Sequence, residues 1–368
     1  MEKNVRVPFC QMRSFIRDVF TEIGVPAGDA EICADVLVTA DKRGIHSHGI
    51  GRLKTIYYDR IVHHKIQKPV TELEVVRDFA AVAAVDGHHG MGMVIAKRCM
   101  EMAIEKAEKF GIGMVTATNS THYGIAAYYP LMAAARDMVG MTGTNARPSV
   151  APTFGVDNLL GTNPLVFAVP TDEGFPFTND YATSIIQRGA VEKAVREGTE
   201  IPEGLVISRN GKSVTDPGEI LEGLISGDVS LLPIGGSGEE TGGYKGYGFS
   251  TVVELLSAAF QQGAFLRQLS GFSGDGSRVP YALGHFFIAV NIKAFTDPAE
   301  FRKTAGGILR TLRNSQKMPC AEKIYTCGEK EHMYEKENAD KGIAVNPALQ
   351  KQILTMRDEL NLDYDFGF

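Results

Sequence analysis

The sequence predicts an α/β protein, in which a helix-flanked mixed sheet of a non-Rossmann type is joined to a helical domain made by both chain ends. Helix-like apolar spacing dominates up to residue 65 and returns near the C-terminus, while short apolar runs alternate with amphipathic helices in between. No G-x-G-x-x-G motif follows the first predicted strand. We therefore expect a helical domain from residues 1–75 with 299–368, and an α/β domain from residues 76–298.

The N-terminal helices are predicted from the spacing of their apolar residues. In residues 9–23 these recur at three- and four-residue intervals, with Pro8 suited to the first turn and Gly24 to the C-terminal stop. A second helix is predicted over residues 29–42. A third is expected to begin after His46 and to turn four side chains inward: Leu53, Ile56, Tyr57 and Ile61.

From residue 80, short apolar runs typical of buried strands alternate with helical patterns. The first strands are predicted over residues 80–87, 111–119 and 139–145, with helices over 91–110 and 125–137 between them. This order implies right-handed crossovers and a largely parallel or mixed sheet. Further strands are predicted over residues 163–171, 175–182 and 284–292.

The remaining segments connect the sheet to the C-terminal end. Residues 205–217 resemble a hairpin with Asn210-Gly211 as the turn, and the glycine-rich residues 226–243 are expected to be a loop. An apolar helix is predicted to follow over residues 243–260. Two amphipathic segments, residues 301–313 and 347–360, end the chain.

Composition restricts the class of protein. The 368 residues are 44% hydrophobic and 22% charged, as in an ordinary soluble globular protein, and the net charge of −6 argues against a broad nucleic-acid surface. No apolar run of about 18 residues predicts a membrane span, and the N-terminus lacks the pattern of a secretory signal. The five scattered cysteines are interpreted as free thiols of a reducing compartment, so we expect a cytosolic protein.

The segment "RGIHSHGIGRL", residues 43–53, is the first candidate for chemistry. If Ser47 caps a helix, His48 in the first turn and Arg52 share a face, separated by ~40° and ~6 Å. A histidine that exchanges a proton and an arginine that clamps a carboxylate would suit a small hydroxy or oxo acid. A polar helix start with a surface histidine fits the spacing equally well. A metal site at His46 and His48 is weaker, because no nearby carboxylate or cysteine completes a ligand set.

The second candidate is His122 in "TATNSTHYG", just after a predicted buried strand and before a helix. Ligands in open α/β sheets bind outside the carboxyl ends of strands, so a histidine there is a good acid/base candidate. The alternative is a histidine that is hydrogen-bonded within a loop.

A third candidate is Lys245, which lies in a glycine turn directly before a helix and could bind a phosphate or carboxylate. Four groups at predicted strand ends could form hydrogen bonds to a ligand, although each alone fits turn chemistry: Asn163, Asp180, Thr183 and Ser184. The motifs of Rossmann dehydrogenases, P-loop enzymes, α/β-hydrolases and zincins are absent from the sequence. The residues alone thus indicate an α/β enzyme without naming its cofactor.

Seven ordered segments together resemble one family, the malate/L-lactate dehydrogenases that are unrelated to the Rossmann-type enzymes of the same names. They extend from about residue 7 to residue 343 and read "RGIHSHGIGRL", "NSTHYGIAAYY", "GTNPLVFAVP", "NDYATS", "GGYKGYGFSTVVELLS", "GHFFIAVN" and "YTCGEKE". The resemblance implies a homodimeric oxidoreductase that uses NAD, with NADP as the alternative, bound to a non-Rossmann sheet domain at residues 76–298. We expect no metal.

Residue roles follow from the resemblance, motif by motif. His122 and His48 would be the acid/base candidates, and Arg52 beside Ser47 would hold the substrate carboxylate. The cofactor would be lined by Asn163, Asp180, Tyr181, Ala182, Thr183, Ser184, Lys245, Gly246, Gly328, Glu329 and Lys330. Two positions depart from the commoner pattern, since Tyr181 replaces a usual Met and Cys327 stands where Pro is frequent. These departures put the fine cofactor preference in doubt.

We therefore expect reversible hydride transfer between a 2-hydroxy acid and a nicotinamide, with malate and oxaloacetate favoured and His122 preferred over His48 as the base. Lactate, sulfolactate, a ureidoglycolate-like acid or a cyclic imine remain alternatives within the class. A cofactor-free oxo-acid lyase or decarboxylase and a non-catalytic ligand sensor are alternatives from other classes.

Overall fold

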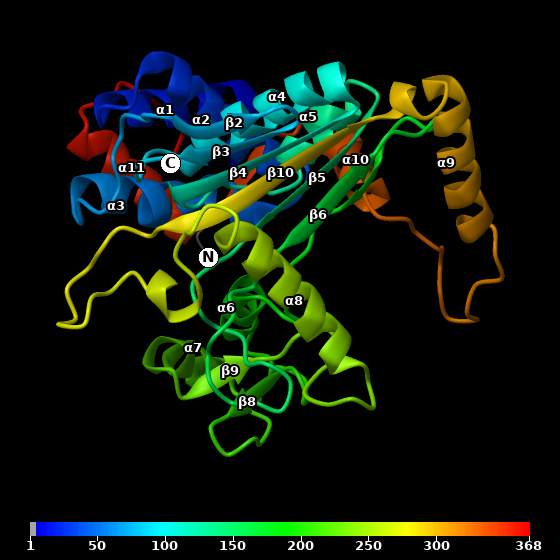
Figure 1. The fold of residues 1–368 in the computed structure, drawn as a ribbon. Helices are drawn as coiled ribbons and strands as arrows, with labels where there is room; N and C mark the ends of the chain where they lie inside the picture. Colours follow the sequence, from blue (N-terminus) through cyan, green and yellow to red (C-terminus); the bar gives the residue numbers. More distant parts are fainter. Residues whose placement is uncertain (1–4) are drawn as a thin grey trace.

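The structure, a computed structural model that describes residues 5–368, is built around a seven-stranded mixed sheet (Figure 1). The strands lie in the order β2-β3-β4-β10-β5-β6-β7. Their bounds are β2 Glu74–Phe79, β3 Val82–Asp86, β4 Ile112–Ser120, β5 Met138–Thr144, β6 Leu165–Val169, β7 Phe177–Asn179 and β10 Leu283–Asn291. Only β3 and β4 pair in parallel, and every other neighbouring pair in this sheet is antiparallel.

The predicted α/β class and mixed sheet are confirmed, whereas a largely parallel sheet is wrong. The reason is β10, which comes from late in the chain and inserts between β4 and β5, antiparallel to both. The strand β2 was not predicted, since all six of its residues are exposed and its sequence "EVVRDF" has no buried apolar face.

Helices cover both faces of the sheet. On one face, α4 (Gly92–Phe110) packs on β4 and β10, and α5 (Tyr128–Ala134) packs on β5. Outside them, α2 (Ala27–Lys42) lies on α4, and α1 (Phe9–Glu22) lies on α2 (Figure 1). On the other face, α8 (Gly243–Ala258) crosses β4, β10 and β5.

The two ends of the chain lie together. The short strand β1 (Val5–Val7) pairs antiparallel with β11 (Ile343–Val345). Phe15 of α1 makes edge-to-face contacts with Tyr364 and Phe366, which follow α11 (Pro347–Glu359). The exact domain boundaries at residues 75 and 299 stay a prediction.

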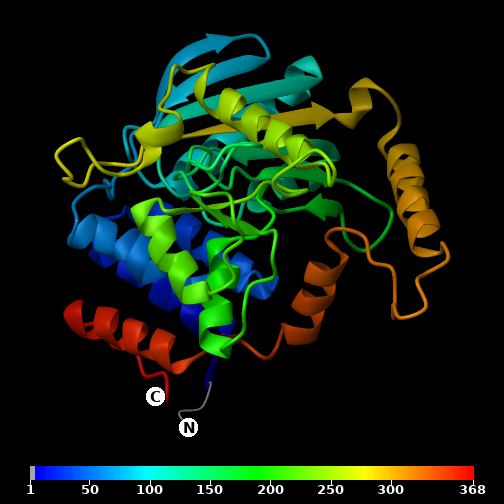
Figure 2. The ribbon, with the colours of Figure 1, turned by 90° about the horizontal axis from the view of Figure 1, so that it is seen from below.

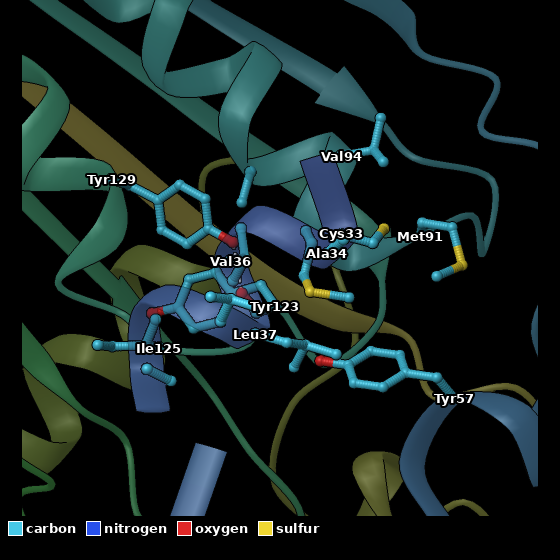
Figure 3. Close-up of a cluster of buried hydrophobic side chains, with 14 of the residues drawn as sticks. Cys33, Ala34, Val36, Leu37, Tyr57, Met91, Val94, Tyr123, Ile125 and Tyr129 are labelled. Atoms are coloured by element: carbon cyan, nitrogen blue, oxygen red, sulfur yellow. Dashed lines mark hydrogen bonds between the residues drawn. The ribbon is translucent and has the colours of Figure 1, made fainter. Parts of the chain in front are cut away.

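Two large hydrophobic cores, and one small cluster of Ala151, Ile207 and Leu232, are found in the described residues. The larger joins the terminal helices to α4, α5 and the sheet, and Figure 3 shows side chains of α2 packed there between Tyr57, Tyr123 and Tyr129. The smaller lies on the α8 side and is formed by a separate small unit. That unit consists of α6 (Arg188–Glu197), α7 (Pro217–Ser226), β8 (Val206–Ser208) and β9 (Val229–Leu231).

Most of the elements that differ from the sequence prediction lie in this small unit. The predicted hairpin turn forms, because Ser208 N–H bonds Lys212 O at 2.9 Å, but the ladder partner of β8 is β9. β9 lies inside residues 226–243, which were predicted to be a loop. The helix α6 was missed because only Val191 and Ala194 of it are buried, too few to give a periodic apolar pattern.

The other elements complete the described chain. They are α9 (Pro298–Arg313), α10 (Glu329–Asn338) and the short 3₁₀ turns Leu266–Leu269 and Ile292–Ala294. Figures 1 and 2 show α9 and the loop after it standing away from the main body. Within residues 5–368, the structure holds no helix with the length and apolarity needed to cross a membrane.

The close contact between α8 and β10 gives a stability prediction at Gly284. A Cβ at Gly284 would lie 1.6 Å from the Ser257 carbonyl oxygen, whereas a Cβ at Gly248, on the exposed side of α8, meets nothing within 4 Å. We expect Gly284→Ala to lower the free energy of unfolding by about 1–3 kcal/mol. Gly248→Ala should raise it by up to ~1 kcal/mol, since alanine is the better helix former.

Urea unfolding of the wild type and both variants measures these opposite effects. Equal midpoints for Gly284→Ala and the wild type would show that α8 does not lie this close to β10.

Candidate active site

A cavity of about 130 Å³ lies where the segment after α2 meets the carboxyl end of β4. It brings together six residues that the sequence singled out: Ser47, His48, His122, Asp180, Tyr181 and Ala182. Its other lining residues are Ile45, Tyr123, Gly124, Ile125, Ala126, Thr144, Asn145, Ala146, Thr162, Pro164, Gln187 and Leu283. Both candidate histidines therefore face one space, although they are far apart in the sequence.

His122 is placed by the end of β4 and the start of α4. β4 ends at Ser120, and the hydroxyl of Thr121 accepts the N–H of Gly92 at 3.0 Å and donates to Gly90 O at 2.9 Å. Gly92 is required here, because a Cβ would lie 2.5 Å from the carbonyl oxygen of His122. The two hydrogen bonds of Thr121 and the close approach of Gly92 thus fix the chain directly before His122.

The His122 ring lies between two aromatic neighbours. Its Nδ1 is 2.7 Å from the Tyr57 hydroxyl and 3.2 Å from the N–H of Gly124. The ring of His48 stacks on it at a centroid distance of 5.7 Å and an angle of 12°. Burial lowers the pKa of His122 well below its usual value, and the charges of His48, Arg60 and Arg52 lower this pKa further. His122 is thus a neutral base at physiological pH.

The segment that carries His48 is not the regular helix that was predicted. It consists of 3₁₀ turns at His46–His48 and Ile50–Arg52, a π-helix at Leu53–Tyr58 (η3) and a short α3 (Asp59–Val62). The buried carboxylate of Asp41 accepts the N–H of Ile50 at 2.8 Å, and a Cβ at Gly49 would meet Asp41 at 2.2 Å. Asp41 of α2 therefore anchors the chain at the point where Ser47 was expected to cap a helix.

Ser47 and His48 interact with each other in place of that cap. The Ser47 hydroxyl lies 2.9 Å from Nδ1 of His48. Burial together with the charge of Arg52 lowers the pKa of His48 to about 4. His48 is therefore also neutral near pH 7, and it remains the alternative base on geometry.

Arg52 lies close to both histidines, although it is not part of the cavity wall. Its Nε donates to the carbonyl oxygen of Ser47 at 2.5 Å. Its two terminal nitrogens make no hydrogen bond with any residue in the described part of the chain. The guanidinium is thus fixed through Nε, and its two terminal nitrogens stay available to bind an anion.

Asp180 follows β7 and faces the same cavity. One of its carboxylate oxygens accepts the N–H of Ala127 at 3.2 Å. Burial raises the pKa of Asp180 to about 6, and the Ala127 hydrogen bond and the Arg43 charge oppose this shift. Beside it, Tyr181 is exposed and Ala182 is buried.

The predicted cofactor residues Thr183, Ser184, Lys245 and Gly246 do not line the cavity but are connected to it. Thr183 O accepts the N–H of Ile234 at 2.9 Å, and a Cβ at Gly246 would lie 2.2 Å from the oxygen of Ile234. The chain after Asp180 therefore leads to the N-terminus of α8, where Lys245 is exposed. The Ser184 hydroxyl is buried and has no hydrogen-bond partner in residues 5–368.

Four other predicted residues lie outside the cavity and make internal contacts. The buried side chain of Asn163 bonds Ala146 N–H, Ser250 O and Glu254. The carboxylate of Glu329 bonds Lys323 and Thr326. Gly328 lies against β7 near Thr178, and the Lys330 ammonium lies 4.7 Å from the centroid of the Tyr325 ring. Their contact with a cofactor stays a prediction.

Several cavity residues were not found from the sequence. Thr144 is the last residue of β5 and Asn145 follows it, so the strand-end rule could have indicated them. Tyr57 was predicted to point inward, but only the fold shows that it meets His122. Gln187 lies in a stretch without strand or helix pattern and gave no signal.

His46 points away from the cavity. Its Nδ1 lies 2.9 Å from Asp41 and its Nε2 3.0 Å from the Tyr334 hydroxyl of α10. This pairing accounts for both ring nitrogens, and it links α10 to the segment that carries His48.

A larger cavity of about 570 Å³ lies along α8. Apolar side chains form most of its wall, and Glu254 is its only carboxylate. That carboxylate bonds Asn163 and the N–H of Leu266. The larger cavity contains no acid/base pair, so the smaller one is the candidate active site.

Comparison with known proteins covers nearly the whole chain. A family model described as malate/L-lactate dehydrogenase matches residues 7–354. A malate dehydrogenase of Pyrococcus abyssi is 42% identical over 98% of this chain and 94% of its own length. An L-sulfolactate dehydrogenase of Methanocaldococcus jannaschii is 36% identical over 96% of each chain.

The fold is also found among solved structures. The crystal structure of malate dehydrogenase from Entamoeba histolytica has a TM-score of 0.95 at 39% identity, over 98% of this chain and 99% of that one. These comparisons confirm the family that the seven sequence segments indicated.

Proposed function

The chain belongs to the malate/L-lactate dehydrogenase family, and we propose that it catalyses reversible hydride transfer between (S)-malate and oxaloacetate with NAD. The observation that carries the proposal is the cavity in which His48 and His122 stack beside the charge of Arg52. This arrangement supplies a neutral base and a carboxylate clamp, the two groups that a 2-hydroxy acid requires.

Proton transfer is assigned to His122. During oxidation of the hydroxy acid, the neutral imidazole removes the proton of the C2 hydroxyl. During reduction of the oxo acid, the imidazolium returns that proton to the C2 oxygen. Because Arg52, Arg60 and His48 lower the pKa of His122, an anionic substrate among them should raise it and favour the imidazolium.

Substrate orientation is assigned to Arg52. The fork of its guanidinium would hold the C1 carboxylate in two hydrogen bonds, with Ser47 and His48 beside it. The excess of positive charge around the cavity also favours entry of a dianion over a neutral molecule.

The residues between Asp180 and α8 fit a nicotinamide dinucleotide. The unpaired hydroxyl of Ser184 and the exposed Lys245 at the positive end of α8 are suited to polar and anionic parts of such a molecule. Asp180, Tyr181 and Ala182 would line its end in the cavity. When bound, the nicotinamide supplies the site that accepts or donates the hydride. NADP remains the alternative to NAD.

Malate is favoured because two relatives with malate dehydrogenase in their names are 42% and 43% identical to the chain. Sulfolactate, which also carries two acidic groups, is the nearest alternative, since a sulfolactate dehydrogenase is 36% identical. Lactate, ureidoglycolate and cyclic imine acids complete the set of substrates to be tested.

An assay at 340 nm over a panel of 2-oxo acids, with NADH and NADPH in parallel, tests the proposal. We expect the highest kcat/KM with oxaloacetate and NADH. A higher kcat/KM with sulfopyruvate would change the substrate, and no oxidation with any pair would exclude the dehydrogenase function. In that case, thermal shifts with oxo acids in the absence of a nucleotide would favour the lyase or the sensor.

We also propose a homodimer, supported by apolar groups around α8. Phe249 and Leu255 are each 57% exposed and Phe265 is 48% exposed, beside the large apolar cavity. Soluble monomers rarely leave such a patch uncovered. Sedimentation velocity should give twice the chain mass of 39.9 kDa. A single species at the chain mass would contradict the dimer.

We keep the cytosol as the proposed location. All five cysteines are free thiols, and Cys33 and Cys99 are buried. Free thiols are typical of a reducing compartment. Cell fractionation would test the assignment, and recovery of the protein outside the cytosolic fraction would contradict it.

A further inference from the structure

The hydroxyl of Tyr57 is the closest polar partner of the His122 ring. Its oxygen lies 2.7 Å from Nδ1 of His122, and the two rings meet edge to face at a centroid distance of 5.7 Å. Tyr57 is fully buried in the core, and Figure 3 shows its ring entering the cluster from η3 with the hydroxyl directed inward. The backbone N–H of Gly124 also forms a hydrogen bond with this hydroxyl.

The π-helix explains why Tyr57 reaches His122. Hydrogen bonds in a π-helix join residues five apart, so Tyr57 lies about one turn from Arg52 and shares its side of the segment. In an α-helix, residues five apart point in clearly different directions. The next residue, Tyr58, points elsewhere and donates to Glu359 of α11 at 2.6 Å.

Both neighbours of Nδ1 belong to the protein interior. The N–H of Gly124 lies 3.2 Å from Nδ1, on the same ring nitrogen as the Tyr57 hydroxyl. His122 nevertheless lines the cavity, and its Nε2 makes no hydrogen bond within residues 5–368. The ring therefore presents Nε2 to the substrate.

We propose that Tyr57 is a positioning residue, whose hydroxyl holds Nδ1 of His122 so that Nε2 exchanges the proton with the C2 oxygen. This inference rests on the proposed function for the identity of the reaction, but the pairing itself does not. The neutral ring can take the substrate proton at Nε2 only as its Nδ1–H tautomer, so the Tyr57 oxygen accepts from Nδ1–H both in the neutral ring and in the imidazolium. A carboxylate could accept this hydrogen too, but its charge would hold the ring protonated.

The charges around the His122 ring make the Tyr57 hydroxyl important as a hydrogen-bond acceptor. The ionisable groups that face His122 are Tyr57 of η3, His48, Arg52, Arg60 and His285 of β10. None of these groups is a carboxylate, and Asp180, which faces the same cavity, forms no hydrogen bond with His122 within residues 5–368. Among the described residues, the Tyr57 oxygen therefore lies where it can accept Nδ1–H when the ring takes up the substrate proton.

Tyr57→Phe and Tyr58→Phe form a matched pair that tests the proposal, because each removes one hydroxyl from adjacent tyrosines. We expect Tyr57→Phe to lower kcat for oxo-acid reduction by about 10- to 100-fold, the usual effect of losing a hydrogen bond to a charged group. The KM for the oxo acid and the cofactor affinity should stay near wild type. Tyr58→Phe should match the wild type in all three.

The pH profile separates positioning from a structural role. Without its acceptor the imidazolium is less stable, so the His122 limb of the kcat profile should move to lower pH by about 1–2 units in Tyr57→Phe. A variant that only loosened packing would lower kcat without moving this limb. Wild-type kcat and an unshifted limb in Tyr57→Phe would overturn the proposal.

An NMR titration of ¹⁵N-labelled histidines needs no turnover. We expect wild-type His122 to show the Nδ1–H tautomer in its neutral form, with that hydrogen bonded to Tyr57, and Tyr57→Phe to lose this signature. Rapid exchange between tautomers in the wild type would overturn the pairing even if the variant fails to fold. If no oxo acid is turned over, the proposed function fails, while this titration still decides the role of Tyr57.

Discussion

Replacement of His122 by alanine is expected to lower kcat by about 10²–10⁴-fold, the contribution of a well-placed general acid or base. The ring lies at the end of β4, faces the cavity and is neutral near pH 7, so it can accept the hydroxyl proton. Without it, water must take the proton at a site built to bind an anion. Steady-state kinetics with saturating oxo acid and NADH measures this effect.

His48→Ala is the comparison that makes the result informative. His48 stacks on His122 and has a pKa of about 4, so it could also act as the base. We expect a smaller fall in kcat than for His122→Ala, with NADH affinity by fluorescence titration unchanged in both variants. A normal kcat in His122→Ala together with a large loss in His48→Ala would assign proton transfer to His48.

His122 shows what the sequence could predict about the site. Its position follows from local pattern alone, because a buried strand and a helix flank a polar turn, and the strand-end rule then places it at a ligand site. The same rule explains Asp180 after β7. Strand ends are local features, so their chemistry is visible before the fold is known.

The segment around Arg52 shows what could not be predicted. Regular helix spacing suggested that Ser47 caps a helix, but the carboxylate of Asp41 takes the N–H of Ile50 and imposes 3₁₀ and π turns. This contact depends on how α2 packs in the folded protein, so the spacing of apolar residues in the sequence does not reveal it. The insertion of β10 between β4 and β5 is a similar case, since the pairing joins strands well over 100 residues apart.

Arg52 itself carries the second large expected effect. Its Nε is held by the Ser47 carbonyl, so the fork has one fixed orientation and two free terminal nitrogens. Loss of two hydrogen bonds to a carboxylate costs about 3–5 kcal/mol, so Arg52→Ala should lower kcat/KM for the oxo acid by about 10²- to 10⁴-fold. The KM for NADH should change much less, because the proposed partner of Arg52 is the substrate carboxylate and not the cofactor.

Arg52→Lys separates charge from shape. The ammonium keeps the positive charge but cannot bind the carboxylate at two points, so an intermediate kcat/KM is expected.

Arg52 lowers the pKa of both His48 and His122, so its removal should raise both pKa values. The His122 limb of the pH profile in Arg52→Ala should then move to higher pH, opposite in sign to the shift in Tyr57→Phe. An unchanged kcat/KM and an unmoved limb in Arg52→Ala would show that this guanidinium neither binds the substrate nor acts on the histidine pair.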